Sequence, residues 1–179
     1  LSQIQEDQIL QDGMLRWNQV GQSSCQAFMP HIWKAHSWGS ASPWKTFQDD
    51  AGLRGVLTTL RERGQAPNAN NLRSELRRWS AGVYNFRPSA AKVLVDRYSV
   101  AQGVVYDPCA GWGGRMLGAL LSHTRSTYGA CEPSTETALG LRSLVSWMGG
   151  FVGDALDRVR LHAVPAESFS PGAADMVFT

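Results

Sequence analysis

The chain has 179 residues, of which 43% are hydrophobic and 18% are charged. This composition is typical of a globular protein and excludes a disordered one. No apolar stretch approaches the roughly 20 residues that cross a bilayer, so we expect no membrane partner. The polar, acidic N-terminal stretch LSQIQEDQILQDG does not resemble a signal peptide.

The formal net charge of +2 conceals an uneven distribution. Residues 51–100 carry nine Lys/Arg and three acids, whereas residues 101–179 carry five Lys/Arg and seven acids. A basic segment beside a nearly neutral one is typical of a protein with a polyanionic partner, although a solvated helical face has the same composition.

The three cysteines and four histidines show no spacing typical of metal ligands. We therefore expect no metal site and no disulfide scaffold, and we expect a reducing, cytoplasmic location. Cys109 and Cys131 stand near the ends of predicted strands, where we expect them to be small buried residues.

The first part of the chain shows the pattern of helices most clearly after residue 42. We expect residues 1–82 to form a helical accessory region. A helix start is predicted at Ser42-Pro43, and apolar spacing predicts an amphipathic helix over residues 49–64. Two further helices are predicted over residues 71–80 and 89–99, the second with Ser89 as its N-cap.

From Gly103 onward the pattern changes to strands that alternate with helices. The strands are predicted over residues 103–107, 127–132, 158–164 and 174–179, with helices over 114–123 and 134–149. Such alternation predicts an α/β fold with a parallel sheet that helices cover on both faces.

The stretch DPCAGWGG, residues 107–114, joins the first predicted strand to a helix. Ligands of parallel sheets bind at this edge, near helix N-termini. A phosphate-binding P-loop is excluded because no lysine follows the glycines. A dinucleotide fingerprint that began at Gly111 would need glycine at position 116, where the chain has Met116.

The pattern Asp-Pro-x-x-Gly-x-Gly at Asp107 to Gly113 resembles the first motif of S-adenosylmethionine-dependent methyltransferases, above all those that methylate amino groups of DNA bases. The resemblance implies a Rossmann-like methyltransferase sheet, present in part, over residues 83–179. It implies that Asp107 and Pro108 open the cofactor loop and that Asp107 takes the ammonium group. Gly111 and Gly113 would let the backbone approach the methionine moiety.

The same resemblance implies three further cofactor contacts. Glu132 ends the second predicted strand and would accept hydrogen bonds from the ribose hydroxyls, as it would in a dinucleotide enzyme. Glu167 follows the third strand and would reach the adenine amino group. NFRPSAAK resembles the motif that leads into the cofactor domain, which would place Phe86 near the methionine end.

The methyltransferases that the chain resembles have a catalytic tetrapeptide of the type Asp/Asn/Ser-Pro-Pro-aromatic after the fourth strand, and we expect it just after Thr179. The expected reaction is methylation of adenine, or less favourably cytosine, in DNA, within a bacterial restriction-modification or phage setting; RNA is not excluded. Arg73, Arg77 and Arg78 are the candidates for phosphate contacts. The alternatives are a non-catalytic nucleic-acid-binding or scaffold module with a degenerate methyltransferase fold, and an oxidoreductase.

Overall fold

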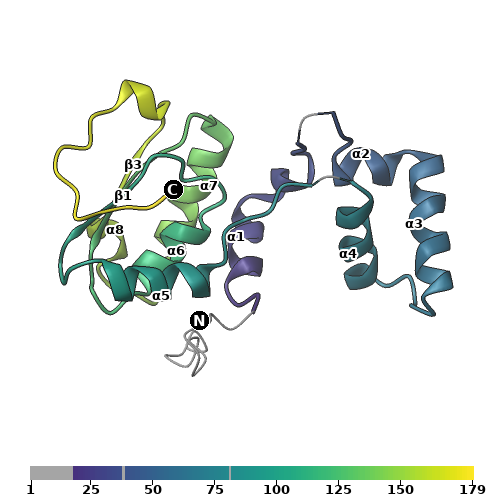
Figure 1. The fold of residues 1–179 in the computed structure, drawn as a ribbon, viewed down its shortest axis with the longest axis horizontal. Coiled ribbons are helices and arrows are strands. Elements are labelled where there is room, and N and C mark those ends of the chain that lie inside the picture. Colours follow the sequence, from purple (N-terminus) through teal and green to yellow (C-terminus); the bar gives the residue numbers. More distant parts are fainter. Residues whose placement is uncertain (1–17, 38, 81) are drawn as a thin grey trace. The chain divides into compact units, whose positions relative to one another are not determined.

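The computed structural model describes residues 18–179 apart from 38 and 81. The described residues form two compact units, one of residues 18–29 together with Asn85–Thr179, the other of Pro30–Tyr84 (Figure 1). The second division of the chain falls between Tyr84 and Asn85, whereas the boundary expected from the sequence lies between residues 82 and 83. Residues 18–29, however, belong to the sheet unit and not to the helical region, because Cys25 and Met29 lie in the core of the sheet unit.

The described residues form eight α-helices, two short 3-10 helices and four strands (Figure 1). In chain order these are α1 (Gln22–Phe28), η1 (Pro30–Trp33), α2 (Pro43–Gln48), α3 (Asp50–Glu62), α4 (Ala69–Trp79), α5 (Pro88–Tyr98), β1 (Val104–Asp107), α6 (Gly114–Leu120), β2 (Thr127–Cys131), α7 (Thr135–Met148), α8 (Ala155–Arg158), β3 (Val159–His162), η2 (Ala166–Ser168) and β4 (Met176–Val177).

The four strands form one parallel sheet in the order β3-β2-β1-β4, which confirms the predicted mixed α/β class. Val105 of β1 pairs with Tyr128 of β2 on one side and with Met176 of β4 on the other. The chain thus runs outward from β1 to β3 and then returns to the opposite side of β1. The strand order therefore reverses between β1 and β4, where α/β sheets offer a crevice at the carboxyl ends of the strands.

Helices cover one face of this sheet. Val105, Tyr128 and Ala130 point to the same side, because side chains alternate along a strand, and they share a core with Leu117 of α6 and Leu141 of α7. The expected helical cover on both faces is not found among the described residues, since the opposite face is met by the connection from β3 to β4.

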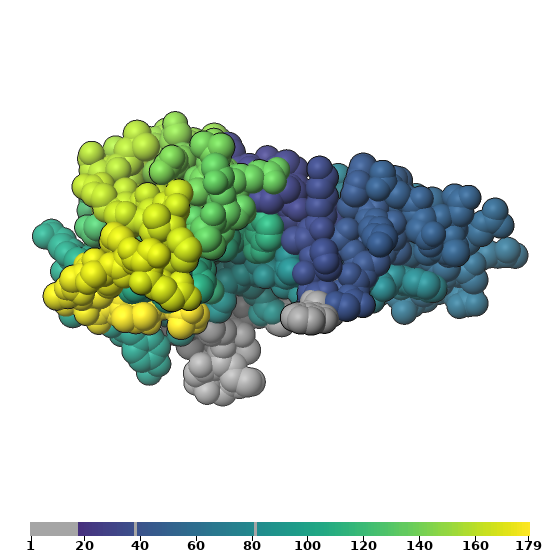
Figure 2. Space-filling model, turned by 90° about the horizontal axis from the view of Figure 1, so that it is seen from above, coloured from purple at the N-terminus to yellow at the C-terminus, as the bar shows by residue number. Residues whose placement is uncertain are grey.

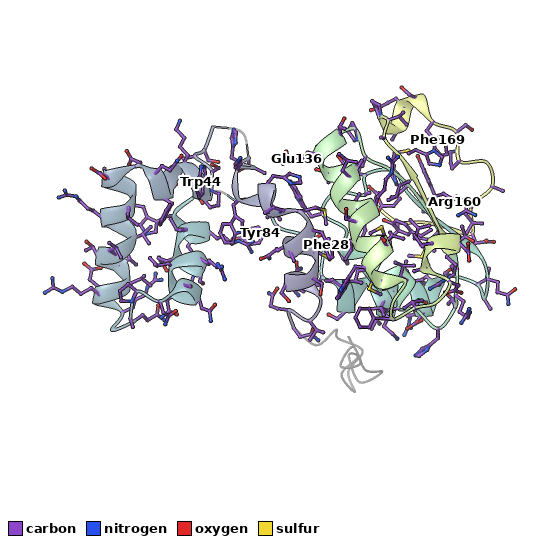
Figure 3. The ribbon with its side chains drawn as sticks, turned by 180° about the vertical axis from the view of Figure 1, so that it is seen from behind. Phe28, Trp44, Tyr84, Glu136, Arg160 and Phe169 are labelled. Carbon is purple, nitrogen blue, oxygen red and sulfur yellow. The ribbon has the colours of Figure 1, made fainter. Side chains whose placement is uncertain are left out.

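Phe169 of this connection stacks on His162 with ring centroids 3.9 Å apart and lies 6.2 Å from Tyr106. The connection forms a continuous part of the surface in Figure 2, and Figure 3 shows Phe169 on it and Arg160 on β3. Gly129 has open space where a Cβ would stand, so part of this face is uncovered.

The unit of residues 30–84 is a small helical module. Ser42 caps α2 as predicted, accepting a hydrogen bond from the Lys45 amide. Val56, Leu60 and Leu76 form a core between α3 and α4, with Leu72 packed against it. The Trp79 ring lies so close to Gly55 that a Cβ there would come within 2.2 Å of it, which explains a glycine in the middle of α3.

Helix α5 differs from its prediction at its first turn. It begins at Pro88 after Arg87, and the Ser89 hydroxyl, instead of capping the helix, donates to Asn18 Oδ1 at 2.7 Å. α5 packs closely on α6 through Gly118, where an added Cβ would come within 2.5 Å of the Ala91 Cβ and 2.6 Å of the Lys92 nitrogen.

Asp96 ties the end of α5 to the turn after α6. Its carboxylate accepts from Lys92 Nζ, from the Ser122 hydroxyl and from the His123 amide, each at 2.7 Å. Burial alone would raise the pKa of Asp96, but these three hydrogen bonds, together with the positive charge of Lys92, lower it below its usual 3.8. The native state therefore favours the ionised carboxylate.

We expect Asp96→Asn to lower the free energy of unfolding by about 2 kcal/mol at pH 7, because charge-assisted hydrogen bonds are lost. A depressed pKa contributes stability that is present at neutral pH and lost as the pH falls through the folded-state pKa, below 3.8. Urea unfolding of both proteins should therefore show a difference that is constant above about pH 5 and shrinks toward pH 3. A difference that stayed constant down to pH 3 would contradict this role of the carboxylate.

Candidate functional site

Acidic side chains stand at the carboxyl ends of the two central strands. Asp107 is the last residue of β1, and Glu132 follows β2 directly. The segment between β1 and α6 contains the glycines predicted to bind a ligand, and Phe178 follows β4 next to it. The strand order brings these residues to one edge of the sheet beside the reversal between β1 and β4.

The Asp107 carboxylate is wholly buried, with 0% of the residue exposed. Arg115 of α6 holds it with two hydrogen bonds, Nε to Oδ2 at 2.7 Å and Nη2 to Oδ1 at 3.0 Å. The Cys109 amide donates to Oδ1 at 3.0 Å, and the Tyr128 hydroxyl donates to Oδ2. A carboxylate offers about four acceptor positions, so all of them are used and none is left for an ammonium group. The predicted contact of Asp107 with an ammonium group stays a prediction, and it would require one of these donors to move away.

The buried charge of Asp107 changes the pKa values of two neighbouring side chains. Burial, followed by the nearby charge of Asp107, raises the pKa of Tyr128 well above its usual value, so the hydroxyl stays a donor. Burial would lower the pKa of Arg115, but its hydrogen bonds and charge pairing with Asp107 raise it. The guanidinium carbon also lies 5.9 Å from the centre of the Phe86 ring and 5.8 Å from that of Phe178.

The glycines of the loop are needed for two different reasons. Gly111 and Gly113 have φ values of 55° and 77°, which side chains rarely adopt. A Cβ on Gly113 would also meet Leu141 Cδ2 at 2.9 Å, whereas one on Gly111 would meet nothing closer than a backbone oxygen at 3.6 Å. At Gly114 a Cβ would fall 1.8 Å from the Phe86 carbonyl oxygen. A Cβ on Gly111 would thus make only an ordinary contact, with the Cys109 carbonyl oxygen, whereas Gly113 and Gly114 allow close packing.

The segment before α5 is fastened to this loop by Asn85. Its Oδ1 accepts from the Gly114 amide, and its Nδ2 donates to the Trp112 carbonyl, both at 3.1 Å. Gln22 of α1 in turn donates to the carbonyls of Asn85 and Phe86 at 3.1 and 3.3 Å. The Phe86 carbonyl oxygen lies close to Gly114, while the predicted contact of Phe86 with the methionine end of a cofactor stays a prediction.

Glu132 is also joined to the loop, across 21 residues of sequence. Its Oε2 accepts from the Gly111 amide at 3.0 Å, and its Oε1 accepts from the Ser134 amide at 2.9 Å. The residue is half-buried. Two of the roughly four acceptor positions of the carboxylate are therefore still available to a ligand.

The other predicted residues take simpler places. Pro108 is half-buried between Asp107 and Cys109. Cys109 is exposed, contrary to the prediction, because the chain has already left the sheet, whereas Cys131 is buried as expected. Glu167 is exposed on η2 and makes no hydrogen bond to another described residue.

In the helical unit, the three arginines predicted to contact phosphates have different surroundings. The Arg77 guanidinium lies 4.4 Å from the centre of the Trp33 ring, and burial lowers its pKa. Arg78 pairs with the buried Glu75 at 3.2 Å, as Arg63 does at 2.6 Å. Arg73 is exposed and makes no ion pair with a described residue.

Within the described ranges, no three His, Cys, Asp or Glu residues are grouped so that they could hold a metal ion. None of the helices described is both long and apolar enough to span a membrane. Comparison of the chain with protein-family models, with curated proteins and with solved structures finds no match. The function is therefore inferred from the geometry of the site and from the resemblance of its motifs.

Sequence reasoning missed four residues of this site: Asn85, Arg115, Tyr128 and Phe178. Arg115 carried a signal, since it is the one cation close to a predicted acid and to the glycine run. Tyr128 lies at the same level as Val105 in the neighbouring strand, so its approach to Asp107 depends on the register and could not be read from spacing. The position of Phe178 beside the loop depends on which side of β1 the strand β4 takes, and the sequence does not determine this.

We expect Asn85→Ala to destabilise the protein by about 1–2 kcal/mol, because two hydrogen bonds that hold the glycine loop are lost. Hydrogen-deuterium exchange should accelerate at the Gly114 amide, because this amide donates a hydrogen bond to Asn85 Oδ1 in the native state. The Leu117 amide, bonded to the Gly113 carbonyl, serves as the internal reference. Equal acceleration at both amides would indicate general loosening of α6 instead of a local anchor.

Proposed function

We propose that the sheet unit binds S-adenosylmethionine and belongs to a methyltransferase that acts on an exocyclic amino group of a nucleic-acid base, adenine in DNA first of all. The observation that carries this is the hydrogen bond between Glu132 Oε2 and the Gly111 amide. It joins the acid after β2 to the glycine loop after β1, the two features on which the resemblance depends.

The residues present suit this cofactor. Glu132 keeps about two acceptor positions for the two ribose hydroxyls. Gly111 has no side chain to hold a ligand away from the backbone, and a Cβ there would meet only the Cys109 carbonyl oxygen within 4 Å. The cofactor has no pyrophosphate, so an acid can stand beside the loop without repelling it. A dinucleotide would instead bring its diphosphate toward α6, where the Gly114 amide already donates to Asn85.

When bound, S-adenosylmethionine supplies an electrophilic methyl group on a sulfonium. This chain's own residues bind and orient: Glu132 holds the ribose end, and Phe86 packs edge-on against Phe178 at 5.3 Å beside the opposite end of the loop. Glu167 is proposed for the adenine amino group, which would require the exposed η2 segment to approach the ligand. Transfer would then depend on proximity and alignment, with the base turned out of the duplex.

The helical unit is proposed to contact the phosphates of the substrate. Residues 30–84 carry eight Lys/Arg and four acids. Arg54 and Arg61 of α3 stand seven residues apart and thus on one side of the helix, opposite the buried Val56 and Leu60. Both arginines are exposed and, like Arg73, make no ion pair with a described residue. These three are better placed for phosphates than Arg77 and Arg78, which have partners in the unit.

We expect the chain to bind S-adenosylmethionine in isothermal titration calorimetry and Glu132→Ala to weaken that binding at least tenfold, about 1.4 kcal/mol, because the ribose hydroxyls lose their acceptor. Asp157→Asn removes an exposed acid from the same unit and should leave the affinity unchanged. NADH and ATP should not compete. Tight NADH binding would favour an oxidoreductase. A chain that binds none of the three ligands would favour the scaffold alternative.

We expect Arg54→Gln/Arg61→Gln to weaken binding to duplex DNA and to reduce the salt dependence of binding. The slope of log K against log salt is negative, and each lost phosphate contact should reduce its magnitude by about 0.9. Fluorescence anisotropy of a labelled duplex at several salt concentrations measures this. The control, Arg142→Gln/Arg160→Gln, removes the same charge from exposed positions of the sheet unit. An equal effect of both double variants would show a response to net charge and not a binding surface.

A further inference from the structure

We propose that Arg115 binds the carboxylate of the amino-acid tail of the ligand, and that Asp107 is the residue that positions Arg115. This rests on the proposed function, because it takes the ligand to be S-adenosylmethionine. It assigns the positive charge of the site to α6 and removes Asp107 from direct contact with the ligand.

The hydrogen bonds of the guanidinium show which part of it is available. An arginine has five N–H donors. Nε donates to Asp107 Oδ2, and Nη2 donates both to Asp107 Oδ1 and to the Cys109 carbonyl. Nη1 makes no hydrogen bond to any described residue. Because no buried side-chain nitrogen or oxygen in the described ranges lacks a partner, Nη1 must reach solvent.

The surroundings of Nη1 suit a carboxylate. The Arg115 side chain is only 15% exposed, so an anion bound there is poorly screened by water. The rings of Phe86 and Phe178 lie at nearly equal distances from the guanidinium, 5.9 and 5.8 Å. Phe86 belongs to the segment before α5 and Phe178 directly follows β4, so Arg115 lies beside the point at which the strand order reverses between β1 and β4. The ion pair with Asp107 fixes the guanidinium in this orientation.

Asp107 itself cannot bind the tail. Its four acceptor positions are taken by Arg115, Cys109 and Tyr128, and the residue is fully buried. A purely structural ion pair would explain these contacts equally well, but it would not make binding depend on the carboxylate of a ligand. That dependence is what distinguishes the two roles.

The test compares S-adenosylmethionine with its decarboxylated analogue, which lacks only the carboxylate, by calorimetry. The wild-type protein should bind S-adenosylmethionine about 10- to 100-fold more tightly, as hydrogen bonds to charged groups allow. In Arg115→Lys the ammonium group can pair with Asp107 but leaves no donor at the Nη1 position, so the ratio of affinities should fall below about threefold. Arg142→Gln, at an exposed position, should keep the wild-type ratio.

A second variant, Asp107→Asn/Arg115→Gln, removes both charges so that no buried carboxylate is left unpaired. Thermal unfolding establishes that it is folded, and its ratio should also fall below about threefold. If the ratio of affinities is unchanged in either folded variant, Arg115 does not bind the carboxylate. The proposal that the protein binds S-adenosylmethionine would still stand. If the wild-type protein binds neither ligand, the proposed function fails as well.

Discussion

The sheet unit is organised around one buried charge, the carboxylate of Asp107 at the carboxyl end of β1. An isolated carboxylate in such a place would cost several kcal/mol, which only good pairing and hydrogen bonding can offset. Arg115 from α6, Tyr128 from β2 and the amide of Cys109 supply that compensation. The first strand, the next strand and the first helix of the sheet are thereby fixed to a single point, and the glycine loop has little freedom between them.

A second constraint acts on the same loop from outside. Asn85 and the Phe86 carbonyl lie against Gly114, and Glu132 holds Gly111. The loop is therefore held at both ends by side chains distant in sequence. A ligand would contact a preformed surface. Binding would then need little further ordering of the loop, because the loop is already ordered in the folded protein. This argues for a binding site more than for an ordinary turn between a strand and a helix.

The strands and most helices could be predicted from the sequence because each depends on local patterns: apolar runs for β1 and β2, helical spacing for α3, and a serine before a proline for α2. Glu132 and the glycines were predicted for the same reason, since they follow strand ends. α1, Asn85 and Arg115 were not recognised, because their roles depend on contacts across 8 to 64 residues of sequence. The expectation of helices on the second face of the sheet was not met for a related reason. Alternation of strands and helices does not determine which face of the sheet a connection covers.

The hydrogen bonds from Gln22 to Asn85 and Phe86 have a consequence for the organisation of the gene product. They join the first residue of α1 to the segment at which the chain returns to the sheet unit, before α5. The helical unit is an insertion in the sheet unit, between α1 and α5. Because loop-closure entropy depends only weakly on the length of such an insertion, an insert of another size should change the stability of the sheet unit little.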